Sequence, residues 1–136
     1  MYMNLAEQYA QQSPCKKRKV GCVIIKDDTV IAYGFNHGYD EICTCSLKHK
    51  NPDVIHAEQM ALQGTCDIYK DADIYITYQP CMQCAKLIVS KKIKRVFYAQ
   101  SSKCTESLNY LNQQGISTQL KGTTNGQYLC NGKRNG

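Results

Sequence analysis

The sequence contains no long apolar run and no segment typical of a secretion signal. A membrane-spanning helix needs roughly 20 consecutive apolar residues, and no stretch of the 136 residues approaches that length. The first residues, MYMNLAEQYAQQSPCKKRK, include an acidic side chain and lack the apolar core of a signal peptide. These absences argue against a membrane or secreted protein, so we expect a soluble protein of the cytoplasm.

Disorder and multiple domains are not indicated either. The hydrophobic fraction is 43% and the charged fraction is 21%, a composition typical of globular chains. No internal repeat or domain boundary interrupts the sequence, and 136 residues fit one domain. We predict a single domain over residues 1–136, with residues 121–136 as a loosely ordered tail because they are rich in glycine and poor in apolar side chains.

The nine cysteines are an odd set without a secretion signal, which argues against a disulfide framework and for thiols or metal ligands. One group is interpreted as small hydrophobic residues: Cys22, Cys66, Cys104 and Cys130. Cys81 and Cys84, in QPCMQC, form a CxxC motif. That motif is the strongest candidate for metal binding among the cysteines.

The hydrophobic pattern alternates between helical and extended segments. Helices are predicted over residues 3–12, 56–63, from Pro80 onward, and 104–114. Strands are predicted over 20–25, 29–36, 72–78, 93–99 and 116–120, with residues 37–54 as a loop. Gly64 is the expected end of the second helix, and Asp27-Asp28 the turn of a hairpin. The pattern predicts an α/β protein, a three-layer α/β/α fold with a central five-stranded mixed sheet.

The basic residues outnumber the acidic ones by 17 to 11 and cluster in two runs, 16–19 and 91–95. Such runs are often only solvated surface. They also suit an anionic partner, either a single phosphate or a polynucleotide.

A histidine and a glutamate precede the CxxC motif, as HAE at 56–58 and PCMQC at 80–84. Both segments open a predicted helix after an extended stretch, so His56, Cys81 and Cys84 can meet at one sheet edge. One nitrogen and two sulfur ligands suit tetrahedral Zn²⁺ with one position open for water. Glu58 is then free to move protons of that water. The alternatives are a histidine hydrogen-bonded in the core and a closed structural zinc site, which would want a fourth Cys or His.

The spacing H-x-E…P-C-x-x-C is the signature of zinc deaminases. With the flanking stretches CKKRKVGCVIIKDDTVIAYGFN (15–36) and CAKLIVSKKIKRVFYA (84–99), the sequence resembles the cytidine and deoxycytidylate deaminase superfamily over roughly residues 1–120, and within it the deoxycytidylate (dCMP) deaminases. The resemblance implies zinc on His56, Cys81 and Cys84, Glu58 as catalytic proton shuttle, and a homohexamer. The implied reaction is hydrolysis of dCMP to dUMP and ammonia, which supplies the precursor for dTMP synthesis.

Substrate contacts are predicted around this centre. The backbone N–H of Ala57 is expected to hold O2 of the base. Asn36 resembles the family residue that contacts a sugar hydroxyl, although it would equally suit a turn. The cations Lys17, Arg18 and Lys19 are expected to meet a 5′-phosphate, which favours a nucleotide substrate.

Other functions remain open from the sequence. The tRNA adenosine deaminases also carry HAE and PCxxC, and the basic tail could bind RNA; other zinc nucleoside or base deaminases share the fold. A non-catalytic zinc module that binds nucleic acid is a further alternative, but Glu58 would have no function in it. We favour dCMP as substrate, and nucleic acid as a partner is not expected.

The loop GFNHGYD, residues 34–40, departs from the family pattern G-Y-N-G-x-P. In the family this loop helps to bind a regulatory triphosphate, with dCTP activating and dTTP inhibiting. Asn36 and Gly38 remain, but His37 intrudes and the proline is absent. Control by dCTP and dTTP, with Mg²⁺ on the triphosphate, is therefore an expectation that the sequence supports only in part.

A second, structural zinc is a further hypothesis, because some deoxycytidylate deaminases carry one with cysteines that resemble Cys15 and Cys43. The candidate ligands are Cys15, Cys43, Cys45 and His49. Cys43 and Cys45 are separated by one residue, which is tighter than usual for zinc, so reduced thiols are the preferred interpretation.

Overall fold

A computed structural model of the chain describes residues 2–38 and 54–122. Its helices are α1 (Tyr2–Ala10), α2 (Ala57–Ala61), α3 (Cys66–Tyr69), α4 (Met82–Ser90) and α5 (Glu106–Gln113). Its strands are β1 (Gly21–Lys26), β2 (Thr29–Phe35), β3 (Asp73–Ile76), β4 (Arg95–Tyr98) and β5 (Ser117–Leu120). None of the helices in these ranges is long and apolar enough to cross a membrane.

The five strands form one sheet in the order β2-β1-β3-β4-β5. Strand β1 is antiparallel to β2 and β3, whereas β3, β4 and β5 run parallel. The β1–β2 hairpin turns at Asp27 and Asp28, whose φ angles of 52° and 61° suit a tight hairpin turn. The predicted five-stranded mixed sheet is thus confirmed.

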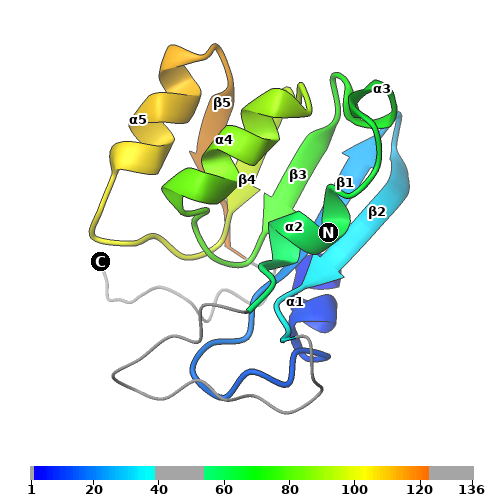
Figure 1. Cartoon of the computed structure of the whole chain (residues 1–136), viewed down its shortest axis with the longest axis vertical. Helices are drawn as coiled ribbons and strands as arrows, with labels where there is room; N and C mark the ends of the chain where they lie inside the picture. The colour runs from blue at the N-terminus through cyan, green and yellow to red at the C-terminus, as the bar shows by residue number, and fades with distance from the viewer. Residues whose placement is uncertain (1, 39–53, 123–136) are drawn as a thin grey trace.

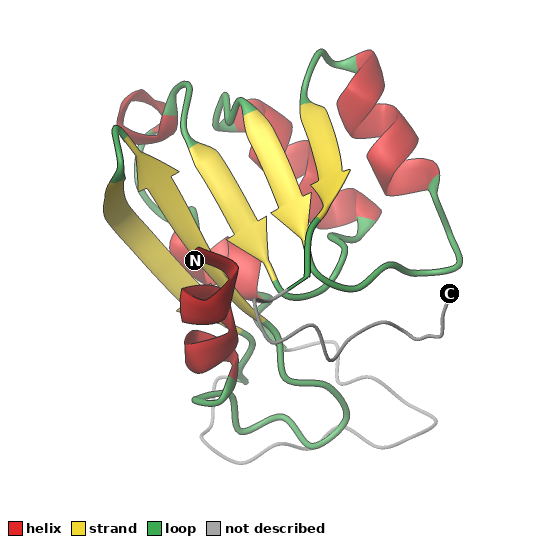
Figure 2. Cartoon of the chain, turned by 180° about the vertical axis from the view of Figure 1, so that it is seen from behind, coloured by secondary structure: helices red, strands yellow, loops and turns green. Residues whose placement is uncertain are grey.

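Helices cover both faces of the sheet (Figures 1 and 2). Helix α1 packs on one face, where Met3 and Ala6 join Val23, Ile25 and Phe97 in a buried cluster. Helices α2, α4 and α5 lie on the other face, over the larger core. Strand β1 is buried from Gly21 to Ile25, as expected of an apolar strand covered on both sides. The three-layer prediction is confirmed.

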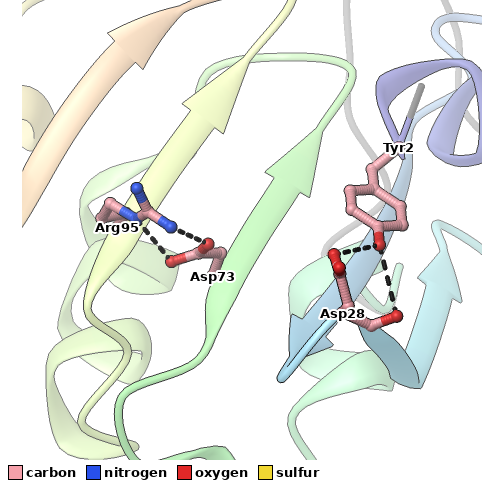
Figure 3. A network of polar contacts seen from close by, with 4 residues as sticks. All are labelled: Tyr2, Asp28, Asp73 and Arg95. Atoms are coloured by element: carbon pink, nitrogen blue, oxygen red, sulfur yellow. Dashed lines mark hydrogen bonds and ion pairs between the residues drawn. The ribbon is translucent and has the colours of Figure 1, made fainter.

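Polar contacts fasten the α1 face at its rim, as Figure 3 shows. The guanidinium of Arg95 donates to both carboxylate oxygens of Asp73, at 2.8 and 2.5 Å, directly across the β3–β4 pair. The hydroxyl of Tyr2 donates to the Asp28 carboxylate at 2.9 Å and so ties α1 to the hairpin turn. This hydrogen bond raises the pKa of Tyr2.

The predicted second helix is too long, and a short helix after it was missed. Helix α2 ends at Ala61, before Gly64, because Leu62 leaves the helical region at φ −102° and ψ 36°. The missed helix is α3, a single turn that periodicity cannot detect. Its Tyr69 is buried; the hydroxyl donates to the carbonyl of Ala61 and accepts the N–H of Gly64.

Two predictions about the later helices are wrong in detail. Helix α4 starts at Met82 rather than Pro80, because Cys81 is extended (φ −75°, ψ 172°) and acts as the N-cap. Cys104 precedes α5 and is exposed, so it does not share a buried face with Leu111. Of the other cysteines interpreted as hydrophobic, Cys22 is fully buried and Cys66 is half-buried. Cys130 and most of the 121–136 tail lie outside the described residues.

Candidate metal centre and substrate pocket

The segment that enters α2 is held against the end of β2. The backbones of His37 and Ile55 exchange two hydrogen bonds, at 2.9 and 2.6 Å. His56 then takes an extended conformation as the N-cap of α2, and its N–H donates to the Gln59 side chain at 2.7 Å. The side chain of His56 is thereby presented at the start of the helix.

The first turn of α2 sits directly on the β1–β2 hairpin. A Cβ atom at Gly34 would lie 2.1 Å from the carbonyl oxygen of Ala57, so only glycine allows this approach. Beneath it, the Cys22 thiol donates to the same carbonyl at 3.4 Å. Burial, with a smaller contribution from the Glu58 charge, raises the pKa of Cys22. Cys22 is therefore a neutral thiol that supports the turn carrying Glu58.

Helix α4 brings the second half of the cluster. Cys81 is its N-cap, and the Cys81 carbonyl accepts the N–H of Ala85 at 2.8 Å. Cys84 lies one turn further along and is fully buried, whereas Cys81 is exposed. Residues at this spacing share one side of a helix end, so the two sulfur atoms face the same point.

His56, Cys81 and Cys84 converge as the sequence predicted. Nδ1 of His56 lies 3.2 Å from Sγ of Cys84 and 3.6 Å from Sγ of Cys81. Their ligand atoms all lie within 4.8 Å of one another. Among residues 2–38 and 54–122, no other group of three potential metal ligands comes together in this way. One imidazole nitrogen and two sulfurs are a donor set that fits Zn²⁺ and leaves a fourth tetrahedral position for water.

The two thiols of the cluster have opposite tendencies to ionise. The hydrogen bond between Cys81 and Cys84 lowers the pKa of Cys81 to about 3, with help from His56 and despite partial burial. The same hydrogen bond, then burial and the Glu58 charge, raises the pKa of Cys84. A bound divalent cation would favour the ionised form of both, since metal ligation needs thiolates.

A cleft of about 690 Å³, including its open mouth, lies beside this cluster. His56, Ala57, Glu58 and Cys81 are among the residues that line it. Glu58 is only 4% exposed, so its carboxyl group belongs to the cleft rather than to the surface. A proton-transfer group next to a metal site in a cleft is an arrangement suited to hydrolysis.

The basic loop supplies part of the same cleft. Lys17 and Arg18 line it, while their contact with a 5′-phosphate stays a prediction. Lys19 does not; its ammonium donates to the carbonyl of Ser13 instead. The ammonium of Lys19 is thus held by a backbone carbonyl of the same loop, outside the cleft lining, and its predicted contact with a phosphate stays a prediction.

Asn36 lines the cleft but also braces this loop. It is 9% exposed; its Oδ1 accepts the N–H of Val20 at 2.9 Å, and its Nδ2 donates to the carbonyl of Arg18 at 2.7 Å. The role of turn-former is thus visible in the structure, while the contact with a sugar hydroxyl stays a prediction.

The hypothesis of a second zinc falls mainly on undescribed residues. Cys15 is buried and lines the cleft. Cys43, Cys45 and His49 lie outside the described residues, as do positions 39 and 40 of the expected effector loop. Both ideas stay predictions.

Two residues of the cleft were missed from the sequence, although they directly precede PCMQC. The ring of Tyr78 lies under the guanidinium of Arg18, with 3.9 Å from Cζ to the ring centroid. Gln79 is buried; its Nε2 donates to the carbonyl of Cys104 at 2.6 Å, and its Oε1 accepts the N–H of Ser102 at 2.9 Å. Their place between a strand end and the metal motif was the available signal.

Comparison with known proteins places the chain in a family. Residues 1–100 match the cytidine and deoxycytidylate deaminase zinc-binding region. Deoxycytidylate deaminase of Saccharomyces cerevisiae is 33% identical over 131 residues, which cover 85% of this chain and 42% of the yeast protein. Deoxycytidylate deaminase of Mycobacterium phage D29 is 32% identical over 124 residues, 74% of this chain and 93% of the phage protein.

A solved structure agrees with these relatives. The dCMP deaminase from cyanophage S-TIM5, in complex with dCMP and dUMP, matches with a TM-score of 0.78 and 30% identity over 88% of this chain and 93% of that one. The chain spans less than two thirds of the yeast protein and of ComE operon protein 2 from Bacillus subtilis, at 42% and 59% of their lengths. With the converging His56, Cys81 and Cys84 and the matched region 1–100, the chain belongs to the cytidine and deoxycytidylate deaminase family.

Proposed function

We propose that this protein is a zinc-dependent dCMP deaminase, which hydrolyses dCMP to dUMP and ammonia and so supplies the precursor for dTMP synthesis. The observation that carries the proposal is one cleft that joins the His56, Cys81 and Cys84 cluster, buried Glu58 and the cations of the basic loop. Relatives named deoxycytidylate deaminases, and a similar structure solved with dCMP and dUMP, support this substrate.

In this proposal His56, Cys81 and Cys84 hold the zinc ion. When bound, zinc supplies a Lewis acid that brings the pKa of a water molecule from its bulk value to about 7. The pKa of about 3 at Cys81 supports ready ligation there at neutral pH. The second sulfur, on Cys84, loses its proton as the cation binds.

Glu58 carries the protons of the reaction. It accepts a proton from the attacking water and delivers it to N3 of the cytosine ring while the oxygen adds to C4. It then transfers the remaining proton of that oxygen to the amino group, which leaves as ammonia. The burial of Glu58 supports this role, because a carboxylate shielded from bulk water exchanges protons mainly with what the cleft holds.

The other cleft residues bind and orient the nucleotide. The N–H of Ala57, at the first position of α2, lacks a partner within the helix and suits O2 of the base. Asn36 suits a sugar hydroxyl, and Lys17 with Arg18 suits the 5′-phosphate.

Two remaining features of the proposal come from the sequence pattern, namely one domain over residues 1–136 and a place in the cytoplasm. A homohexamer, control by dCTP and dTTP, and Mg²⁺ with the effector rest on family resemblance. Reduced thiols stay the preferred interpretation of Cys15, Cys43 and Cys45, with a second zinc on these residues and His49 as the alternative. The tRNA adenosine deaminase alternative is not favoured. The tRNA-specific enzymes of Rickettsia typhi and Schizosaccharomyces pombe match 53% and 71% of this chain, while the deoxycytidylate deaminase of Saccharomyces cerevisiae matches 85%.

The test is to incubate purified protein with dCMP, dCTP, cytidine and tRNA. We expect the cytosine absorbance band of dCMP to disappear as ammonia is released, with much slower reaction of the other substrates. Release of ammonia from tRNA but not from dCMP would favour the alternative. If zinc-loaded protein leaves all four unchanged, a non-catalytic zinc module becomes the better description.

A further inference from the structure

We infer that Tyr78 is a positioning residue, whose ring holds the guanidinium of Arg18 ready for the 5′-phosphate of the substrate. The inference rests on the proposed function and adds a determinant of selectivity for nucleotides over nucleosides. The Cζ atom of Arg18 lies 3.9 Å from the centroid of the Tyr78 ring, and both residues line the cleft. At this distance the guanidinium lies over the ring face in a cation–π contact.

Arg18 is held at two points. Its carbonyl accepts a hydrogen bond from Nδ2 of Asn36 at 2.7 Å, and the Oδ1 of the same Asn36 accepts the N–H of Val20 at 2.9 Å. The backbone of Arg18 is therefore fixed at the end of β2, while Tyr78 fixes the far end of the side chain. Because ordering a long side chain opposes binding, an arginine ordered in advance binds its anion more tightly.

Stacking on the ring leaves the charge of Arg18 available. An aromatic ring contacts the flat face of a guanidinium. The N–H donors of the guanidinium point outward in its own plane, where they suit two phosphate oxygens. The one ion pair between side chains of residues 2–38 and 54–122 joins Arg95 to Asp73. No carboxylate of those ranges thus pairs with Arg18. Lys19 also has no carboxylate partner there, but its ammonium is held by the Ser13 carbonyl.

Tyr78 is itself held by its neighbours along the chain. The N–H of Thr77 donates to the carbonyl of Gly21 at 2.9 Å, and the N–H of Gln79 donates to the carbonyl of Gln100 at 2.8 Å. The segment continues through Pro80 into Cys81 of the metal cluster. One short segment therefore carries both a metal ligand and the platform for Arg18, which fixes the span between reacting base and phosphate.

The experiment compares nucleotide with nucleoside in Tyr78→Leu, Tyr78→Phe and a matched control, Tyr33→Leu. Tyr33 is 44% exposed on the edge strand β2, where its ring stacks on Tyr9 and stays outside the cleft. KM and kcat are measured for dCMP and deoxycytidine, and dissociation constants for dUMP and deoxyuridine by calorimetry. Tyr78→Leu should raise KM for dCMP and the dUMP dissociation constant roughly fivefold, with a much smaller change in kcat and in the nucleoside constants. Tyr78→Phe should restore wild-type values.

A double-mutant cycle decides whether Tyr78 acts through Arg18. In an Arg18→Ala background, Tyr78→Leu should cause no further loss of dUMP affinity. Full additivity of the two losses of dUMP affinity would overturn the inference. Equal losses of affinity for nucleotide and nucleoside would also overturn it, because Tyr78 would then contact the base or the sugar. If Tyr78→Leu fails to fold, Arg18→Lys, which keeps the charge but not the planar stack, should show the same selective loss.

The binding measurement also separates this inference from the proposed function. If wild-type protein does not turn over dCMP, the proposed function fails, yet dUMP and deoxyuridine affinities still test Tyr78. Wild-type protein that binds these two ligands equally would overturn the inference even if dCMP is deaminated.

Discussion

Nδ1 of His56 lies 3.2 Å from Sγ of Cys84, although the two residues come from different helix starts, 28 positions apart. Their contact exists only when the starts of α2 and α4 lie side by side on the sheet, so metal binding is coupled to the fold. We predict one tightly bound zinc per chain, and a zinc content well below one in Cys84→Ser, with a lower melting temperature.

Elemental analysis and thermal unfolding check this prediction. Cys104→Ser is the matched control, because Cys104 is exposed and outside the cluster; it should keep its zinc. Absence of zinc from wild-type protein prepared without chelator would contradict the assignment. A ratio near two that falls to one in Cys15→Ser would instead support the second site.

Glu58→Gln should keep the zinc and the fold and lose nearly all turnover. The amide preserves size and hydrogen bonding but cannot shuttle a proton. General acid–base groups contribute about 10²–10⁴-fold, and Glu58 acts in two steps, so kcat should fall toward the upper end. Glu106→Gln, at an exposed position in α5, is the control. Wild-type turnover in Glu58→Gln would assign Glu58 a structural role.

Gly34→Ala should destabilise the protein and lower its activity together. The added methyl group would lie 2.1 Å from the Ala57 carbonyl oxygen and 2.9 Å from the Ala61 nitrogen, so the turn that carries Glu58 has to shift. Overpacking of this kind costs about 1–3 kcal/mol, measurable by urea unfolding. Gly122→Ala is the control, since nothing lies within 4 Å of its Cβ position. Unchanged stability in Gly34→Ala would contradict the tight packing of α2 on β2.

Monophosphate selectivity should depend on Lys17 and Arg18 but not on Lys19. Replacing either of the first two by alanine should raise KM for dCMP about tenfold, because each removes a charge-assisted hydrogen bond. Lys19→Ala should mainly lower stability, since Lys19 bonds to the Ser13 carbonyl. Steady-state kinetics and thermal unfolding distinguish the two effects. If the wild-type protein deaminates cytidine and dCMP with equal kcat/KM, the 16–19 loop does not bind the phosphate and its cations are only surface charge.

The sequence predicted the sheet and the metal cluster because both depend on patterns along the chain. Buried β1 is a continuous apolar run, and HAE and PCMQC each follow an extended segment. It did not predict which cation of the 16–19 run faces the cleft, because a loop has no period to assign its side chains to sides. The carbonyl that binds Lys19 and the ring that holds Arg18 are set by tertiary structure.

Helix starts were missed for a similar reason. Proline is favoured at the first helical position, which pointed to Pro80, but Cys81 adopts the extended conformation of an N-cap. Likewise, Cys104 has the right spacing from Leu111 for a shared face, yet α5 begins only at Glu106. Local spacing cannot tell whether a residue lies inside a helix or just before it.

The position of β1 between β2 and β3 has a consequence for synthesis of the chain. The ribosome releases the β1–β2 hairpin well before β3. Until β3 emerges, the edge of the apolar strand β1 that faces away from β2 has no strand to pair with. Unpaired apolar edges recruit other chains. Fragments that end before Asp73 should therefore aggregate, whereas fragments that extend past Ile76 should gain solubility, and nascent chains stalled between these lengths should depend most on chaperones.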